Sequence, residues 1–231
     1  MRFSEGALLE NHLMFLATHR GALLGFGDCV LLQSDREEFT FAFVGPEANL
    51  NHLETFNSFQ LLPGAPEPEG FTRQGGTSYM VYEGDVNSLK DGPDVLRSES
   101  LADFEVFSWV QARGFVPDDE DYAFWHPWLR QANMHNLGNP DQSFYVASLG
   151  EPVGTALLLV HEGIGGIYAV TTLEAFRKKG IGTALLKRAI LDARARGCHT
   201  ITLQVDEGSY AETLCRKLGF RTVFSTRCFV R

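Results

Sequence analysis

The feature that most constrains this chain is a basic turn with two glycines, which lies between a strand-like segment and a helix-like segment. Residues 166–172 form an apolar run, residues 177–183 are Arg-Lys-Lys-Gly-Ile-Gly-Thr, and residues 184–193 have the apolar spacing of a helix. The first N–H groups of a helix have no partner within it, and the helix dipole adds positive potential there. Glycines let the backbone approach an anion closely. The sequence therefore predicts a phosphate-binding site at the start of this helix.

Other phosphate-binding loops fit this stretch less well. A dinucleotide-binding loop requires G-x-G-x-x-G, but Leu185 occupies the place of the third glycine. The G-x-x-x-x-G-K-[ST] pattern does not occur in the chain. The remaining alternative is a basic turn that binds no ligand.

The segments on both sides of the turn extend the pattern. Alternating and apolar runs predict a hairpin before the turn, and helical spacing after it predicts a helix that ends at Gly197. A further strand and a further helix follow, and that last helix closes with Leu214-Cys215-Arg216-Lys217-Leu218-Gly219-Phe220. The expected elements are the hairpin strands 143–149 and 152–160, the strand 201–205 and the helix 210–218.

This order of elements, with its Arg-x-x-Gly-x-Gly turn, resembles the GNAT superfamily of acetyl-CoA-dependent N-acetyltransferases. The resemblance covers residues 94–231 and is most specific over residues 143–220. It implies an α/β (α+β) fold, with a mixed, mostly antiparallel sheet flanked by helices, in a GNAT-type domain at residues 93–231. Residues 1–92 would form an additional N-terminal α/β segment, which is compatible with a degenerate, partial GNAT unit. Its open roles are packing, dimerisation into a homodimer, or closure of the acceptor site.

The resemblance also implies a cofactor and a reaction. The turn would hold the pyrophosphate of acetyl-CoA, and the strand before it would splay from its neighbour and donate N–H groups to the thioester and the pantetheine arm. An N–H group directed at a developing oxyanion accelerates acyl transfer. The implied function is direct transfer of an acetyl group from acetyl-CoA to a primary amine of a small molecule or peptide, in a ternary complex. A non-catalytic acyl-CoA-binding sensor or scaffold is the alternative. The implied cofactor-binding residues are Ala169, Val170, Thr172, Arg177, Lys178, Lys179, Gly180, Ile181, Gly182 and Thr183.

The catalytic proton donor implied by the resemblance is changed in this chain. The family's usual donor is the tyrosine of a Leu-Tyr-x-Lys-Leu-Gly-Phe segment, and Cys215 stands at its position. A cysteine thiol, with an ordinary pKa near 8.5, could donate the proton, or the residue could be a small buried filler. Tyr210 is the second candidate donor. Gly208 replaces the asparagine that often begins this helix in the family, so one pantetheine contact differs.

No general base has motif support. Gln204 stands where some relatives carry a glutamate, and a glutamine cannot take up the proton. Gly165 and Gly166 stand at a second position where other relatives carry one. Water could deprotonate the amine instead. The acid or imidazole groups that remain are His161, Glu162, Glu174, Asp206 and Glu207.

Charge is distributed unevenly along the 231 residues. The net charge is −9, to which residues 177–231 contribute about +8 and residues 1–176 about −17. The basic part suits the phosphates of coenzyme A, and the acidic part would attract a cationic acceptor, unless it only keeps the protein soluble. Most of the surface would repel a nucleic acid. Residues 118–128 combine acids with aromatics, so they would either border the acceptor or form an acidic helix start followed by core aromatics.

Composition and the remaining patterns complete the expectations. The four cysteines have no C-x-x-C spacing and are expected to be reduced thiols, with no metal site. No run is long enough to cross a bilayer and no signal-peptide core begins the chain, so we expect a cytoplasmic protein without a membrane partner. Outside the segments above, we expect helices at 8–16, 50–59 and 103–114, and strands at 38–44, 77–82 and 95–97.

Overall fold

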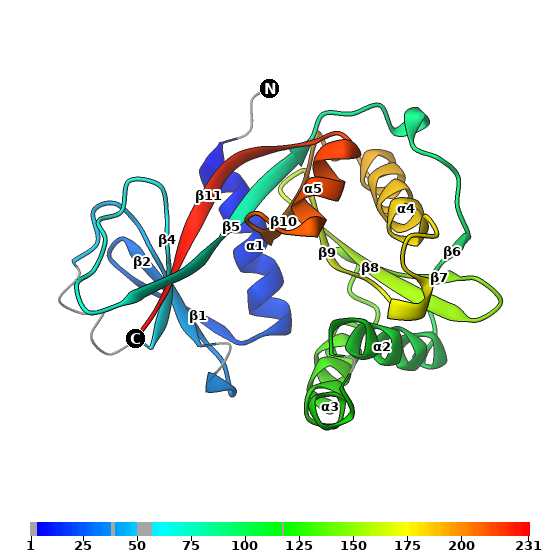
Figure 1. The fold of residues 1–231 in the computed structure, drawn as a ribbon, viewed down its shortest axis with the longest axis horizontal. Coiled ribbons are helices and arrows are strands. Elements are labelled where there is room, and N and C mark those ends of the chain that lie inside the picture. The colour runs from blue at the N-terminus through cyan, green and yellow to red at the C-terminus, as the bar shows by residue number, and fades with distance from the viewer. Residues whose placement is uncertain (1–3, 38–39, 50–56, 117) are drawn as a thin grey trace. The chain divides into compact units, whose positions relative to one another are not determined.

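The computed structural model describes residues 4–37, 40–49, 57–116 and 118–231, which form two compact units (Figure 1). Unit 1 is Tyr82–Leu203, and unit 2 combines Ser4–Val81 with Gln204–Arg231. Strands β5 (Thr72–Tyr82) and β10 (Thr200–Asp206) carry the chain from one unit to the other. In both units helices accompany a mixed, mostly antiparallel sheet, so the predicted fold class is confirmed.

The sheet of unit 1 has the strand order β10-β9-β8-β7-β6. Neighbouring strands are antiparallel except β9 and β10, which are parallel. Glu162 and Gly163 have φ values of +50° and +73° in the two-residue turn between β8 and β9, and positive values at both positions are typical of a type I′ hairpin turn. Strands β7 and β8 are paired antiparallel, so the predicted hairpin is confirmed, as is the strand after it. Their bounds are β6 Asp94–Arg97, β7 Gln142–Ser148, β8 Pro152–His161 and β9 Ile164–Thr172.

Three helices accompany this sheet: α2 (Leu101–Phe115), α3 (Asp119–His135) and α4 (Ile181–Ala195). Helices α4 and α2 pack on strands β8 and β9 from opposite sides, and α3 packs on α2 (Figure 1). A glycine in β8 permits the close approach of α4, because a Cβ atom at Gly154 would lie 2.7 Å from the Cγ2 atom of Ile181. Gly197, with a φ of +80°, ends α4 as predicted.

Unit 2 has the strand order β1-β2-β3-β4-β11-β5. Strands β3 and β4 are parallel, whereas β4 and β11 are antiparallel. Part of its core lies between β3, β4 and β11, where Val44, Phe59 and Phe229 are almost wholly buried. The other elements of unit 2 are α1 Glu5–His19, β1 Ala22–Phe26, β2 Cys29–Gln33, β3 Phe41–Val44, β4 Ser58–Leu61, α5 Tyr210–Lys217 and β11 Phe220–Val230. Short 3₁₀ turns at Val86–Ser88 and Glu174–Phe176 belong to unit 1.

Several expectations for the first 92 residues need correction. Most of the helix expected at residues 50–59 lies outside the described residues, and its last part is wrong, because Ser58–Leu61 is strand β4. Residues 38 and 39 of an expected strand also lie outside them, while Phe41–Val44 is a strand. The predicted division at residue 92 follows the family resemblance, whereas the compact units change at Tyr82 and Leu203, so that division stays a prediction.

The described residues include no helix that is long and apolar enough to cross a membrane. Over the same ranges, no group of three or more His, Cys, Asp or Glu side chains is arranged to hold a metal ion. The four cysteines are free thiols.

Candidate cofactor-binding and catalytic site

Strand β9 contains a bulge within the segment expected to bind the cofactor. Its register with β8 pairs Leu157 with Tyr168 but Thr155 with Thr171, so β9 has one more residue than β8 over this stretch. Ala169 has a φ of +50°, in the left-handed region that residues with a Cβ seldom adopt. The Thr155 hydroxyl donates a hydrogen bond to the Ala169 carbonyl at 2.9 Å. A bulge interrupts the ladder and redirects the backbone groups beside it.

The other edge of β9 is paired over only part of its length. Its parallel ladder with β10 runs from Ile164 opposite Thr200 to Ile167 opposite Leu203. Among the described residues this ladder ends there, whereas β9 continues to Thr172. The end of the ladder supports the predicted splay over the last residues of β9.

A short turn joins the end of β9 to helix α4. The Arg177 Nε atom donates to the Thr172 carbonyl at 3.3 Å, so the end of the strand and the basic turn are adjacent. Lys178 and Gly180 have left-handed φ values of +64° and +80°. The Lys179 ammonium lies 4.8 Å from the centre of the Phe176 ring. The Arg177, Lys178 and Lys179 side chains are exposed, so this turn presents three cations to solvent.

The start of helix α4 has the features of an anion site. Its N-cap residue is Gly180, and no side chain caps the helix. A Cβ atom at Gly180 or Gly182 would meet no other atom within 4 Å, so the approach to the first turn is open. The helix is fixed beneath by Ile181 and Leu185, which are buried. Uncapped N–H groups, a helix dipole and three nearby cations fit a diphosphate group.

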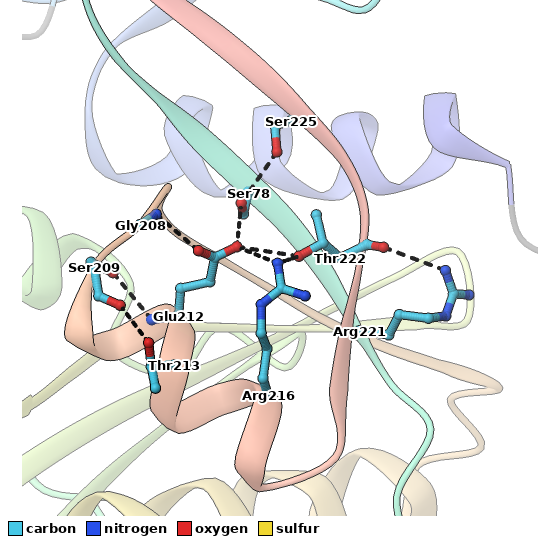
Figure 2. Close-up of polar contacts among 9 residues, drawn as sticks. All are labelled: Ser78, Gly208, Ser209, Glu212, Thr213, Arg216, Arg221, Thr222 and Ser225. Carbon is cyan, nitrogen blue, oxygen red and sulfur yellow. Dashed lines mark hydrogen bonds and ion pairs between the residues drawn. The ribbon is translucent and has the colours of Figure 1, made fainter.

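Helix α5, in unit 2, is held by a buried carboxylate that sequence reasoning did not single out (Figure 2). The side chain of Glu212 accepts hydrogen bonds from the Gly208 N–H at 2.8 Å, the Ser78 hydroxyl at 2.8 Å and the Arg216 guanidinium at 2.7 Å. The Thr222 hydroxyl donates a fourth bond at 3.3 Å. Hydrogen bonds, led by that from the Gly208 N–H, lower the pKa of Glu212 to about 2. Glu212 is therefore a carboxylate at neutral pH and ties α5 to strands β5 and β11.

The two candidate proton donors lie on this helix in contrasting surroundings. Cys215 is 5% exposed, and burial, followed by the negative charge of Glu212, raises the pKa of its thiol to about 11. Tyr210 is 73% exposed, in the first turn. In the first turn of α5 both Tyr210 and Ala211 are exposed, whereas Glu212 and Cys215 are buried.

The candidate base groups have different environments. Glu207 pairs with Arg73 at 3.3 Å. Glu162, Glu174 and Asp206 are exposed, and His161 is half-buried. The Gln204 amide nitrogen is enclosed and has no hydrogen-bond partner among the described residues, so it is a donor that a ligand or water could satisfy.

The acidic and aromatic segment at residues 118–128 begins helix α3. The Asp118 side chain caps this helix by accepting from two backbone N–H groups. Arg113 pairs with Asp119 at 2.7 Å, and its guanidinium lies 3.8 Å from the centre of the Tyr122 ring. One aromatic face and one acid of the segment are thus already used by a cation of the chain, while Phe124 is 50% exposed. A role in acceptor binding stays a prediction.

A bulged strand, a basic turn and an uncapped helix start follow one another in this mixed sheet, in the order that the family resemblance implies. The family model described as the acetyltransferase (GNAT) family matches residues 101–220, more than half of the chain, and the chain belongs to this family. The resemblance to this family found in the sequence is confirmed, and the protein is an acyltransferase.

Individual relatives agree with this assignment. The chain is 28% identical over 143 residues to an N-alpha-acetyltransferase of Sulfolobus acidocaldarius, an alignment that covers 55% of this chain and 80% of that protein. In fold it is similar to a GCN5-related N-acetyltransferase from Kribbella flavida, with a TM-score of 0.69, 18% identity and coverage of 97% and 94% of the two chains. A putative GNAT acetyltransferase from Novosphingobium aromaticivorans has a TM-score of 0.61, 18% identity and coverage of 96% of each chain.

The sequence analysis missed two residues of the site, Glu212 and Thr155. Ser209 lies three residues before Glu212, which is the spacing of a capping box, so the sequence contained a signal for Glu212. The part played by Thr155 depends on the register of β8 against β9, which no local pattern reveals.

Proposed function

We propose that this acyltransferase moves an acetyl group from acetyl-CoA to a primary amine, by direct transfer in a ternary complex. The observation that carries the proposal is the uncapped start of α4, which follows three cations in a GNAT family chain. The acceptor is inferred from the relative in Sulfolobus acidocaldarius, whose name describes acetylation of an alpha-amino group. We therefore take a small-molecule or peptide amine as the acceptor.

The chain's own residues have distinct parts in this proposal. Acetyl-CoA supplies an acetyl group activated as a thioester. Residues 177–183 would hold the diphosphate through backbone N–H groups and cationic side chains. The backbone of Ala169, Val170 and Thr172 would bind the pantetheine arm and donate to the thioester oxygen, where negative charge develops during transfer.

The group transfer requires two proton movements. A C–N bond forms as the C–S bond breaks, the amine nitrogen loses a proton, and the departing sulfur gains one. The raised pKa of Cys215 makes its thiol a weak donor to a thiolate of ordinary basicity, which favours a packing role for this residue. Tyr210, exposed in the first turn of α5, remains the second candidate. Water is our preferred acceptor of the amine proton, because the candidate bases have no motif support.

The acceptor's charge is inferred from the acidic part of the chain. Residues 1–176 carry a net charge of about −17, which would draw cations toward the protein at long range. The use of Tyr122 and Asp119 by Arg113 removes two groups from that role. We therefore base the preference for a cationic amine on the overall field rather than on a single contact.

The proposal is tested by a turnover assay with acetyl-CoA and a panel of amines, in which released coenzyme A is measured. The panel should contain peptides with free alpha-amino groups, lysine-like amines, polyamines and acidic amines. Release of coenzyme A that depends on an amine supports the proposal. Tight binding of acetyl-CoA without release on any amine contradicts it.

A further inference from the structure

We infer that the Thr155 hydroxyl is a positioning group that fixes the direction of the Val170 N–H by holding the bulge of strand β9. The inference rests on the proposed function, because it assigns that N–H to the thioester oxygen. Thr155 would not touch the cofactor, and it would act through the backbone of the neighbouring strand.

The first observation is the backbone conformation at Ala169. A φ of +50° costs little for glycine but is unfavourable for a residue with a Cβ atom. The chain nevertheless has alanine at this position. Interactions around the bulge must therefore stabilise the conformation.

The second observation is the hydrogen bond that meets this requirement. Thr155 is wholly buried in β8, and its hydroxyl donates to the Ala169 carbonyl at 2.9 Å. The register between the two strands shifts over the same residues, so the ordinary ladder is interrupted there. The Thr155 hydroxyl therefore gives the Ala169 carbonyl a hydrogen-bond partner at the point where the regular pairing of the two strands is interrupted.

The third step follows from peptide geometry. The Ala169 carbonyl and the Val170 N–H belong to one planar trans peptide, so they point in opposite directions. Because the carbonyl is bonded toward β8, the N–H is directed toward the other edge of β9. On that edge the ladder with β10 ends at Ile167. The Thr155 hydrogen bond thus opposes a peptide flip that would turn this donor away from the open edge.

The central test is Thr155→Val, which keeps the shape of the side chain and removes the hydroxyl. Removal of a preorganised donor to an oxyanion typically lowers kcat by about 10²–10³-fold, and a misdirected donor should cost roughly 10- to 100-fold. The affinity for coenzyme A, which has no acyl oxygen, should change less than about twofold because the α4 contacts remain. Thr155→Ser retains the hydroxyl and should stay close to the wild-type kcat.

A second substitution distinguishes positioning from general packing. Ala169→Gly makes the left-handed conformation favourable without help from Thr155, so in the Thr155→Val background it should restore roughly five- to tenfold in kcat. Thr200→Val is the matched control, because Thr200 is also a buried threonine of unit 1 and its hydroxyl bonds to His199. This control should leave kcat unchanged.

The outcomes separate the two proposals. A wild-type kcat in Thr155→Val, or no recovery when Ala169→Gly is added to it, would overturn the inference while acetyl-CoA turnover by the wild type persists. Absence of acetyl-CoA binding by the wild-type protein would refute the proposed function, and the inference with it. If Thr155→Val fails to fold, Thr155→Ala takes its place: the inference requires a lowered kcat that added Ala169→Gly partly restores, and a wild-type kcat overturns it.

Discussion

The buried carboxylate of Glu212 supports a quantitative prediction for Glu212→Gln. This change keeps the size of the side chain, removes its charge and places an amide where four donors converge. The pKa of Glu212 is lowered from 4.5 to about 2, and a tenfold change in acidity corresponds to about 1.4 kcal/mol, so the carboxylate contributes at most about 3.5 kcal/mol. Because Arg216 is about half exposed and can be rehydrated, we expect a loss of about 2–3 kcal/mol in the free energy of unfolding.

The assay is urea unfolding of the wild type and Glu212→Gln at several pH values. A lowered pKa in the folded state means that the contribution is present above pH 4.5 and is lost as the pH falls toward about 2. The difference between the two proteins should therefore be largest near neutral pH and shrink below pH 4.5. Burial, assisted by Arg20, lowers the pKa of His12 to about 3, which destabilises both proteins in acid and cancels in the difference.

The matched control is Glu207→Gln, in the same unit. Glu207 pairs with Arg73 on the surface, where both side chains are about half exposed, so the loss should be about 0.2–1 kcal/mol. The reasoning fails if Glu212→Gln costs no more than this control, or if its cost does not depend on pH.

The remaining predictions concern the cofactor, the acceptor and the proton donor. Gly182→Glu should abolish acetyl-CoA binding in calorimetry while the fold is retained, because the new side chain projects into open space and carries a negative charge, as a phosphate does. Gly182→Ala controls for the added volume, and unchanged affinity in Gly182→Glu would exclude the α4 site. Polyamines and lysine-like amines should be acetylated faster than acidic amines, with a bias that falls at high salt, and a preference for acidic amines would contradict the role of the acidic field. Cys215→Ala should lower the melting temperature modestly and leave kcat within a few-fold, whereas a loss of about 10²–10⁴-fold with intact acetyl-CoA affinity would instead establish the thiol as the proton donor.

Local patterns were sufficient to predict most of unit 1 from the sequence. The hairpin of β7 and β8 has alternating and apolar runs joined by a turn that contains a glycine. Helix α4 has a clear apolar face, and Gly197 follows its last turn. These signals are local because each element is ended by its own turn or cap. The basic turn was predictable for the same reason, since its glycines and cations are contiguous in the chain.

Features that depend on distant partners were not predictable. The bulge at Ala169 arises from the register of β9 against β8, and nothing in the sequence around Ala169 requires a positive φ. The burial of Glu212 depends on Ser78, which is far away in the chain and is adjacent only after unit 2 assembles. Strands β1 and β2 were missed because their residues are mostly half-buried or exposed and give weak alternation.

The strand order of unit 2 has a consequence for biosynthesis. Strand β11 lies between β4 and β5, yet its residues are synthesised after those of both neighbouring strands. Until then, the edges of β4 and β5 that face β11 are unpaired, and unpaired edges are sites of aggregation. Unit 1 is a continuous segment whose residues are all made before β11, so it can begin to fold while unit 2 waits for its closing strand. A nascent chain stalled before residue 220 would thus depend on chaperones that shield exposed strand edges.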